Sequence, residues 1–242
     1  MIILGGNNMI KMIVTSFYNT LIDEEDAIPT STMFMLDRYK NKGSSLTILC
    51  NRLLDEVLYY NHSYPFIHYL IGLNGSLIYD VEKNQIFAKM KLDDSIIEEV
   101  ESRFSDYSIL YYTENEVLEE KQGNIYKIEV KLPKKNKKIL DSCKDLDAYC
   151  SILEVHKEYY LEISPSTFQR GLELLLEEKK ITPEEVLGII GNDSDTTLIS
   201  YIPECYVVSN ATHELKAKTK KRTKSCTSKG VETLLKKLLK KS

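Results

Sequence analysis

Apolar residues in the first third of the chain follow two alternating patterns. Short continuous apolar runs alternate with longer segments in which apolar residues recur every three or four positions. The first pattern is typical of buried strands and the second of amphipathic helices. We therefore predict strands at 12–17, 45–50 and 66–72, and helices at 30–41 and 52–61. This order predicts a parallel sheet covered by helices.

The middle of the chain, residues 80–161, has a different pattern. Its strand-like segments, such as 124–132, alternate apolar with polar residues. Alternation indicates a sheet with one exposed face. Further strands at 85–92, 108–113, 149–155 and 159–165, and helices at 94–104 and 135–146, complete this part. We predict that residues 80–161 form an inserted α+β cap domain.

The last third returns to the first pattern, with helices predicted at 168–180 and 230–241 and strands at 186–191 and 205–210. Residues 1–79 and 162–242 then form one domain. The predicted fold class is α/β: a Rossmann-like, doubly wound parallel-sheet core with the α+β cap inserted into it.

Composition excludes several classes of protein. The chain has 242 residues, of which 43% are hydrophobic and 28% charged, so it can bury a full core and is neither fibrous nor wholly disordered. It contains no run of 18 apolar residues, and we expect no membrane association. The net charge of -4 gives no reason to expect nucleic-acid binding. Eleven Lys and Arg residues lie in 216–242, and this basic end could meet an anionic partner. In 230–241, however, leucines at helical spacing predict that the lysines form the solvated face of a terminal helix.

The five cysteines are scattered and odd in number, without the spacing of a metal site. This pattern predicts reduced thiols and therefore a cytoplasmic protein.

Six segments occur in an order and spacing that carry more weight together than any one does alone. They are IVTSFYNTLI (13–22), LTILCNR (46–52), NGSLIYD (74–80), LEISPSTFQRGLELLL (161–176), IIGNDSDTTLI (189–199) and SNATHELKAKT (209–219). In this order they resemble the motifs of the haloacid dehalogenase-like phosphatases, in particular the Cof-type branch, which has a large α+β cap.

The resemblance implies which groups an active phosphatase holds at these positions. An aspartate at the position of Ser16 attacks phosphorus, and a second aspartate at the position of Tyr18 acts as general acid and base. Magnesium is held by the nucleophile, a backbone carbonyl and carboxylates of the GDxxND motif. In this chain the two aspartates of that motif are replaced by Asn192 and Thr196, and its asparagine by Asp195. All four carboxylates are therefore missing at their family positions.

The resemblance also assigns phosphate-binding positions to Cys50, Asn51 and Arg170. Cys50 stands where the family has a hydroxyl, whereas Arg170 replaces a lysine and keeps its charge. We expect Ser16, Cys50, Arg170 and Asn192 to meet at the C-terminal ends of the core strands.

These substitutions favour the hypothesis of a phosphatase-like protein with little or no hydrolytic activity, a pseudo-phosphatase that binds a small phosphorylated molecule. Magnesium, the family cofactor, is then expected to bind weakly or not at all. A second hypothesis is a Mg²⁺-dependent phosphatase of a sugar phosphate or nucleotide with a rebuilt site. There Ser16 is the nucleophile, although the nearby sequence offers it no general base, and Asp193 and Asp195 hold the metal. A third hypothesis is a regulatory module that binds a protein through its cap or its basic terminal helix.

Overall fold

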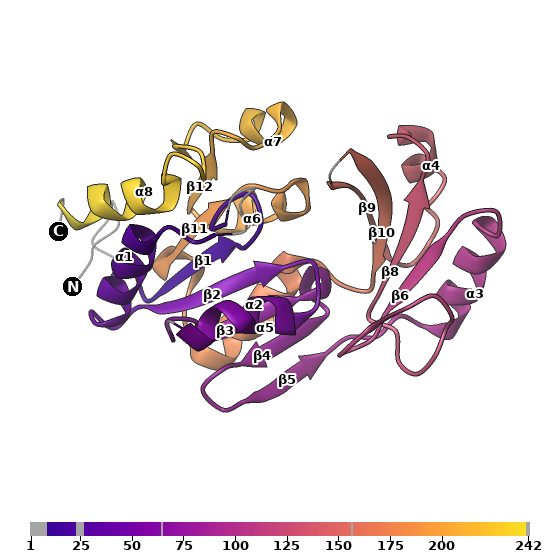
Figure 1. Cartoon of the computed structure of the whole chain (residues 1–242), viewed down its shortest axis with the longest axis horizontal. Coiled ribbons are helices and arrows are strands. Elements are labelled where there is room, and N and C mark those ends of the chain that lie inside the picture. Colours follow the sequence, from indigo (N-terminus) through magenta and orange to yellow (C-terminus); the bar gives the residue numbers. More distant parts are fainter. Residues whose placement is uncertain (1–8, 23–26, 64, 156, 241–242) are drawn as a thin grey trace.

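The computed structural model describes residues 9–22, 27–63, 65–155 and 157–240 (Figure 1). The larger part of it is built on an eight-stranded sheet with the strand order β13-β12-β11-β1-β2-β3-β4-β5. Its strands are β1 (Met12–Ser16), β2 (Ser45–Cys50), β3 (Tyr69–Gly72), β4 (Leu77–Asp80), β5 (Gln85–Lys89), β11 (Val186–Ile190), β12 (Glu204–Val208) and β13 (Arg222–Thr223).

The first six strands of this order, from β13 to β3, are parallel, and β4 and β5 join them in antiparallel fashion. The chain starts in the middle of the sheet at β1, extends it on one side through β2 and β3, and returns to place β11 on the other side of β1. This is the doubly wound arrangement predicted from the sequence.

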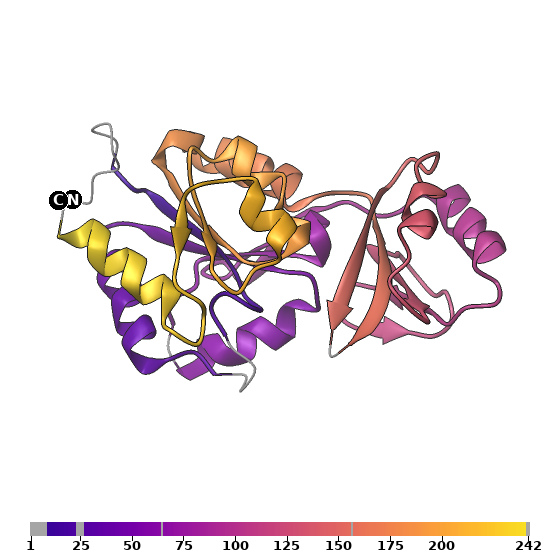
Figure 2. The same ribbon diagram turned by 90° about the horizontal axis from the view of Figure 1, so that it is seen from above.

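Helices cover both faces of the core sheet (Figure 2). One face carries α1 (Thr30–Lys40), α2 (Leu54–Ser63) and α8 (Gly230–Leu239), and the other carries α5 (Phe168–Lys179) and α6 (Leu198–Tyr201). Helix α8 buries three of its four leucines. The Tyr39 hydroxyl of α1 donates to the backbone carbonyl of Leu235 at 2.9 Å. Short elements complete the core: α7 (His213–Ala217) and the 3-10 turns η1 (Leu73–Gly75), η2 (Pro183–Glu185) and η3 (Asp193–Asp195).

The cap is a second, antiparallel sheet with the strand order β7-β6-β8-β10-β9. Its strands are β6 (Ile109–Tyr112), β7 (Val117–Leu118), β8 (Lys127–Leu132), β9 (Tyr149–Val155) and β10 (Glu158–Ser164), and its helices are α3 (Asp94–Arg103) and α4 (Lys137–Asp141). The cap has its own apolar core, to which Val100, Ile128 and Leu161 belong. Figure 1 shows it as a separate lobe beside the core.

Three details of the cap differ from the sequence-based predictions. Strand β5, at residues 85–89, pairs with β4 in the core sheet, although we placed the whole of 80–161 in the cap. The chain enters the cap only after Lys89, and β10 carries it back as far as Ser164. Helix α4 is much shorter than the predicted 135–146, because the chain turns at Ser142. Apolar periodicity identifies a strand but not the neighbour with which it pairs, which explains the error at β5.

Within the ranges that the structure describes, no helix combines the length and the apolar character needed to cross a bilayer.

Candidate functional site

The predicted motif positions lie where three neighbouring strands end. β1 ends at Ser16, β2 ends at Cys50, and the segment after β11 begins with Gly191. Because these strands are adjacent and parallel, their C-terminal ends share one edge of the sheet. The edge is tightly packed: a Cβ atom on Gly191 would lie 2.4 Å from Thr20 Oγ1, so this position requires glycine.

The nucleophile position is occupied by a buried hydrogen-bonded pair. The Ser16 hydroxyl donates to Asp195 Oδ2 at 2.6 Å, and neither residue is more than 1% exposed. The same oxygen accepts the backbone N–H of Asn192 at 2.9 Å. Sequence reasoning missed this partner, because the two residues are 179 positions apart.

Burial determines the protonation of Asp195. It raises the pKa of this carboxyl to about 6, from an ordinary value of 3.8, although the hydrogen bonds from Ser16, Asn192 and Gly191 favour the charged form. The desolvation of the anion thus exceeds the stabilisation from its donors. Asp195 is a carboxylate at neutral pH that becomes neutral in mild acid.

This pKa predicts a specific pH dependence of stability. The folded state binds the Asp195 proton more tightly than the unfolded state does. The contribution of Asp195 to the free energy of unfolding therefore falls by about 3 kcal/mol as pH rises from about 4 to about 6. Above about pH 6 this contribution is constant. In the Asp195→Asn variant the side chain cannot titrate, so this decrease in the free energy of unfolding should be absent. Urea unfolding of both proteins at about pH 4 and about pH 7 measures it. The same change with pH in wild type and variant would contradict the assignment.

Tyr18, at the acid/base position, is held by two residues that follow β2: Arg52 in the loop after that strand and Glu56 in α2. Its hydroxyl donates to Glu56 Oε2 at 2.5 Å, and the Arg52 guanidinium lies 5.5 Å from the ring centroid. Burial, followed by the hydrogen bond to Glu56, raises the pKa of the phenol far above its ordinary value. Tyr18 therefore remains a protonated donor that already has an acceptor.

Three asparagine side chains join the first and last motifs. Asn19, which adopts a left-handed conformation with φ 59°, donates through its side-chain amide to Asn192 Oδ1 at 2.9 Å. Asn192 in turn donates to the backbone carbonyl of Tyr18 at 3.2 Å, and Asn210 to that of Asn19 at 2.9 Å. Neutral amide side chains thus link the two motifs.

The remaining polar groups of the last motif are also hydrogen-bonded. Thr212 donates to Asp193 Oδ1 at 2.5 Å, and Thr196 donates to the backbone carbonyl of Asp193 at 2.7 Å. Asp193 is partly exposed whereas Asp195 is fully buried, so the two carboxylates occupy different surroundings.

Comparison with known proteins places the chain in a family. The family model described as haloacid dehalogenase-like hydrolase matches residues 13–147 and 101–235, which together span most of the chain. The chain belongs to the haloacid dehalogenase-like hydrolases. No curated protein matches it.

Solved structures of other haloacid dehalogenase-like proteins share the fold over 93–98% of the chain. A haloacid dehalogenase-like hydrolase from B. subtilis is 13% identical with a TM-score of 0.82, covering 93% of this chain and 99% of that one. A phosphatase of the superfamily from Bacteroides thetaiotaomicron is 14% identical with a TM-score of 0.81, covering 98% and 97%. A structure described as a subclass IIB sugar phosphatase is 14% identical with a TM-score of 0.78, covering 93% and 98%. At these identities the likeness establishes the fold.

Haloacid dehalogenase-like phosphatases use Mg²⁺, and the residues present in this member do not fit that ion. Mg²⁺ requires hard oxygen ligands, usually with one or two carboxylates among them. The Ser16 hydroxyl is directed to Asp195, and Asn192 and Thr196 are neutral. Over residues 9–22, 27–63, 65–155 and 157–240, no three His, Cys, Asp or Glu side chains are grouped so as to hold a metal.

The predicted phosphate-binding residues have separate environments. Burial raises the pKa of the Cys50 thiol to about 12, so it remains protonated. The side-chain amide of Asn51 donates to Glu162 of the cap at 3.3 Å. Arg170 lies in the first turn of α5, is largely exposed and pairs with Glu173 at 3.2 Å. Ser16, Cys50 and Asn192 thus lie at neighbouring strand ends, while the Arg170 guanidinium faces solvent beside Glu173.

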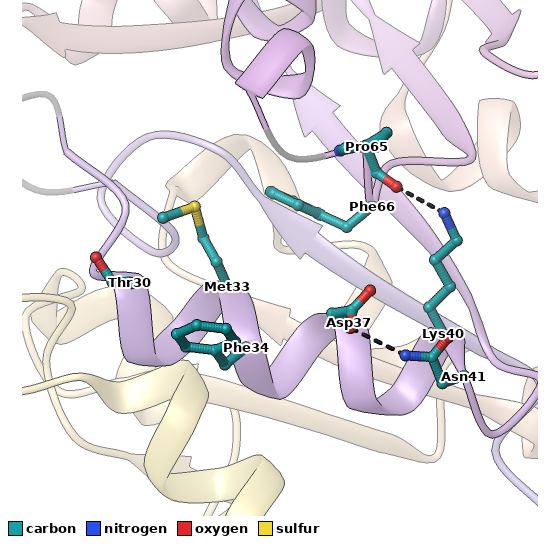
Figure 3. A pocket seen from close by; sticks show the side chains of 8 residues that line it. All are labelled: Thr30, Met33, Phe34, Asp37, Lys40, Asn41, Pro65 and Phe66. Carbon is teal, nitrogen blue, oxygen red and sulfur yellow. Dashed lines mark hydrogen bonds between the residues drawn. The ribbon is translucent and has the colours of Figure 1, made fainter.

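A polar cleft of about 180 Å³ separates this edge of the core from the cap. The core lines it with Asn19, residues 191–194, Asn210 and Thr212, and the cap lines it with Lys135, residues 151–154 and Glu162. A larger, mainly apolar hollow of about 280 Å³ lies beside α1 (Figure 3). Met33, Phe34 and Phe66 surround it, and its lining includes none of the motif residues at the strand ends.

A buried ion cluster, which sequence reasoning missed, joins the cap to the core. The Lys127 side chain is completely buried and its Nζ contacts Glu129 at 2.6 Å and Glu162 at 3.3 Å. The same ammonium donates to the backbone carbonyl of Asn51 at 2.5 Å and lies 4.0 Å from the Tyr112 ring centroid. Lys127 and Glu129 alternate with the apolar residues of β8, a pattern from which we predicted that one face of this sheet is exposed. The core covers these two side chains instead.

Proposed function

We propose that this haloacid dehalogenase-like protein has lost the aspartyl-phosphate chemistry and uses the cleft between core and cap to bind a small phosphorylated molecule. The observation that supports the loss most directly is the hydrogen bond between Ser16 and Asp195. The group at the nucleophile position is buried, and its hydroxyl is directed to a buried carboxylate behind the cleft.

The lining of the cleft is compatible with a phosphorylated ligand. Lys135 supplies a cation, and the side chains of Asn19, Asn210 and Thr212 supply polar groups. The lining has three carboxylates, those of Glu154, Glu162 and Asp193. Glu162 and Asp193 already accept hydrogen bonds from protein donors, which offsets their repulsion of an anion.

One observation favours a second candidate function, a phosphatase with a rebuilt site. A serine hydroxyl 2.6 Å from a carboxylate whose pKa is about 6 has the geometry of a nucleophile and its general base. The structural neighbour described as a sugar phosphatase would suggest a sugar phosphate as the substrate. The burial of both groups and the missing metal ligands favour the first proposal.

An assay of phosphate-ester hydrolysis distinguishes the two proposals. With p-nitrophenyl phosphate and Mg²⁺, we expect wild type to release no more p-nitrophenol than the Ser16→Ala and Asp195→Asn variants, because the aspartate nucleophile and the metal ligands are absent. Turnover by wild type that both substitutions abolish would establish the rebuilt phosphatase instead.

Binding is tested separately with inorganic phosphate as the probe. We expect phosphate to raise the thermal midpoint of wild type, and to raise that of Lys135→Ala less, by mass action on the folded state. Lys144→Ala, an exposed lysine of the cap that pairs with Asp141, serves as the matched control. An equal response of wild type and Lys135→Ala would contradict binding in this cleft.

A further inference from the structure

Two basic segments, one in the cap and one in the core, lie beside the cleft. The cap segment, 134–138, runs from the loop after β8 into the first turn of α4, and the core segment, 216–229, runs from α7 to the start of α8. Neither contains an acidic residue, although the whole chain has a net charge of -4. We call the two segments together the basic rim. Its cations are Lys134, Lys135, Lys137 and Lys138 of the cap and Lys216, Lys218, Lys220, Lys221, Arg222, Lys224 and Lys229 of the core.

The two sides of the basic rim meet beside the cleft. Lys137 of α4 forms an ion pair with Glu214 of α7 at 3.2 Å, which joins the cap to the core at this point. Lys135 lines the cleft from the cap, and Thr212, the N-cap residue of α7, lines it from the core. The hydrogen bond from Lys137, followed by the charges of Lys137 and Lys135, lowers the pKa of Glu214, so Lys135 is also close to α7. Figure 1 shows α4 and α7 on the same side of the molecule, one on each lobe.

The core side of the basic rim is anchored to the wall of the cleft. The Lys216 ammonium donates to the backbone carbonyl of Ser209 at 3.0 Å, and the next residue, Asn210, lines the cleft. The side-chain oxygen of Asn210 accepts the backbone N–H of Cys226 at 3.2 Å, so the later part of the segment also reaches this wall. Lys224 directly follows β13, a parallel strand whose C-terminal end lies at the same edge of the sheet as the motif residues.

Most cations of the basic rim lack an acidic partner. With the residues that the structure describes, no ion pair is formed by Lys134, Lys135, Lys138, Lys218, Lys220, Lys224 or Lys229. By contrast, three nearby carboxylates already pair with a lysine or accept a hydrogen bond from the protein: Glu162, Asp193 and Glu214. Glu154 is the carboxylate of the lining that has no such pairing to a described residue, and the unpaired lysines outnumber it. Unpaired positive charges on both sides of a cleft concentrate an electrostatic potential that attracts multiply charged anions.

We propose that the basic rim extends the cleft as a binding surface for an oligophosphate, so that the ligand carries two or more phosphoryl groups. One phosphoryl group occupies the cleft, and the next one lies at the rim. An ammonium group has three N–H donors, so Lys216, which uses one on Ser209, keeps two for phosphate oxygens. Each added phosphoryl group brings further negative charge and acceptor oxygens, which strengthens the attraction to the unpaired lysines. The inference rests on the proposed function, because it names the chemical class of the ligand in the same cleft.

The surroundings of the basic rim favour a small oligophosphate over a nucleic acid. Its cations come from two domains on either side of a cleft of about 180 Å³, instead of following one extended face. Proteins that bind single-stranded nucleic acid add exposed aromatic rings on which the bases stack. The large apolar side chains that are exposed in the described part of the chain all lie outside the rim: Phe34, Tyr59, Val117 and Tyr149.

Titration calorimetry with inorganic phosphate, pyrophosphate and tripolyphosphate, at fixed ionic strength and without divalent cations, tests the proposal. We expect wild type to bind tripolyphosphate at least about tenfold more tightly than phosphate, because the longer anion reaches the rim. Lys224→Ala should weaken the binding of tripolyphosphate about threefold to tenfold and leave that of phosphate unchanged, whereas Lys135→Ala should weaken both. Lys237→Ala, which removes an exposed lysine of α8 outside the rim, is the matched control and should change neither.

The possible failures of the two proposals are distinguishable. Equal affinities of wild type for the three anions would overturn the oligophosphate inference and leave the proposed function intact. Equal losses in Lys224→Ala and Lys237→Ala would also overturn it, since they would show attraction to overall charge alone. Tighter binding of a single-stranded oligouridylate than of tripolyphosphate would assign the rim to nucleic acid instead. If none of the three anions binds, the proposed function fails and the inference fails with it.

Discussion

Replacing Lys127 by alanine should lower the free energy of unfolding by about 3–5 kcal/mol. Lys127 is the cation of a buried cluster in which Glu129 and Glu162 have almost no exposure to solvent. Removing the ammonium leaves two buried carboxylates without their counterion and the carbonyl of Asn51 without its donor. A buried charge that has lost its partner is destabilising by more than the pair itself contributes. Urea denaturation at neutral pH measures the change.

The same strand offers a matched control. Lys131 lies on β8 and pairs with Glu158 at 2.6 Å, but both side chains are about half exposed. Its replacement by alanine should change the free energy of unfolding by only about 0–1 kcal/mol, because solvent screens an exposed pair. A combined Lys127→Met, Glu129→Gln and Glu162→Gln variant should recover much of the loss, since it removes the carboxylates together with the cation. Equal effects of Lys127→Ala and Lys131→Ala would refute the role of the cluster.

Restoring the family's carboxylates should restore Mg²⁺ binding and hydrolysis, and should do so most fully when Asp195 is changed as well. The variant combines Ser16→Asp, Tyr18→Asp, Asn192→Asp, Thr196→Asp and Asp195→Asn. In Mg²⁺ we expect saturable binding by calorimetry and hydrolysis of p-nitrophenyl phosphate at least about 10³-fold above wild type. Metal, nucleophile and acid act as a unit, so the single variants should each remain inactive.

The fifth substitution follows from the structure. The Ser16 hydroxyl is hydrogen-bonded to Asp195, so a carboxylate introduced at position 16 would contact a second buried carboxylate. The fourfold variant that keeps Asp195 should therefore bind Mg²⁺ more weakly than the fivefold variant and unfold more easily. Circular dichroism checks that both are folded. A folded fivefold variant that neither binds Mg²⁺ nor hydrolyses the ester would show that more than the carboxylates has been lost from this site.

The sequence by itself determined the fold and the identity of the motif positions. Continuous apolar runs marked β1, β2 and β11 as buried parallel strands, and the end of a parallel strand fixes the edge to which the next residues belong. That is why Ser16, Cys50 and Asn192 could be assigned to one edge in advance. The leucine spacing of α8 likewise predicted its buried face, since helical geometry alone sets which positions share a side.

Only the tertiary structure decided which groups meet across the chain. The hydrogen bond between Ser16 and Asp195 joins residues that are 179 positions apart in the sequence, and no local sequence pattern predicts it. β5 was assigned to the cap because alternation does not reveal a strand's neighbour. The alternation of β8 predicted a sheet with one exposed face, but the packing of the core against the cap buries Lys127 and Glu129 on the polar side of this strand. Local periodicity records which face of an element is apolar, whereas the assembly of elements determines what covers its polar face and therefore which charges are buried together.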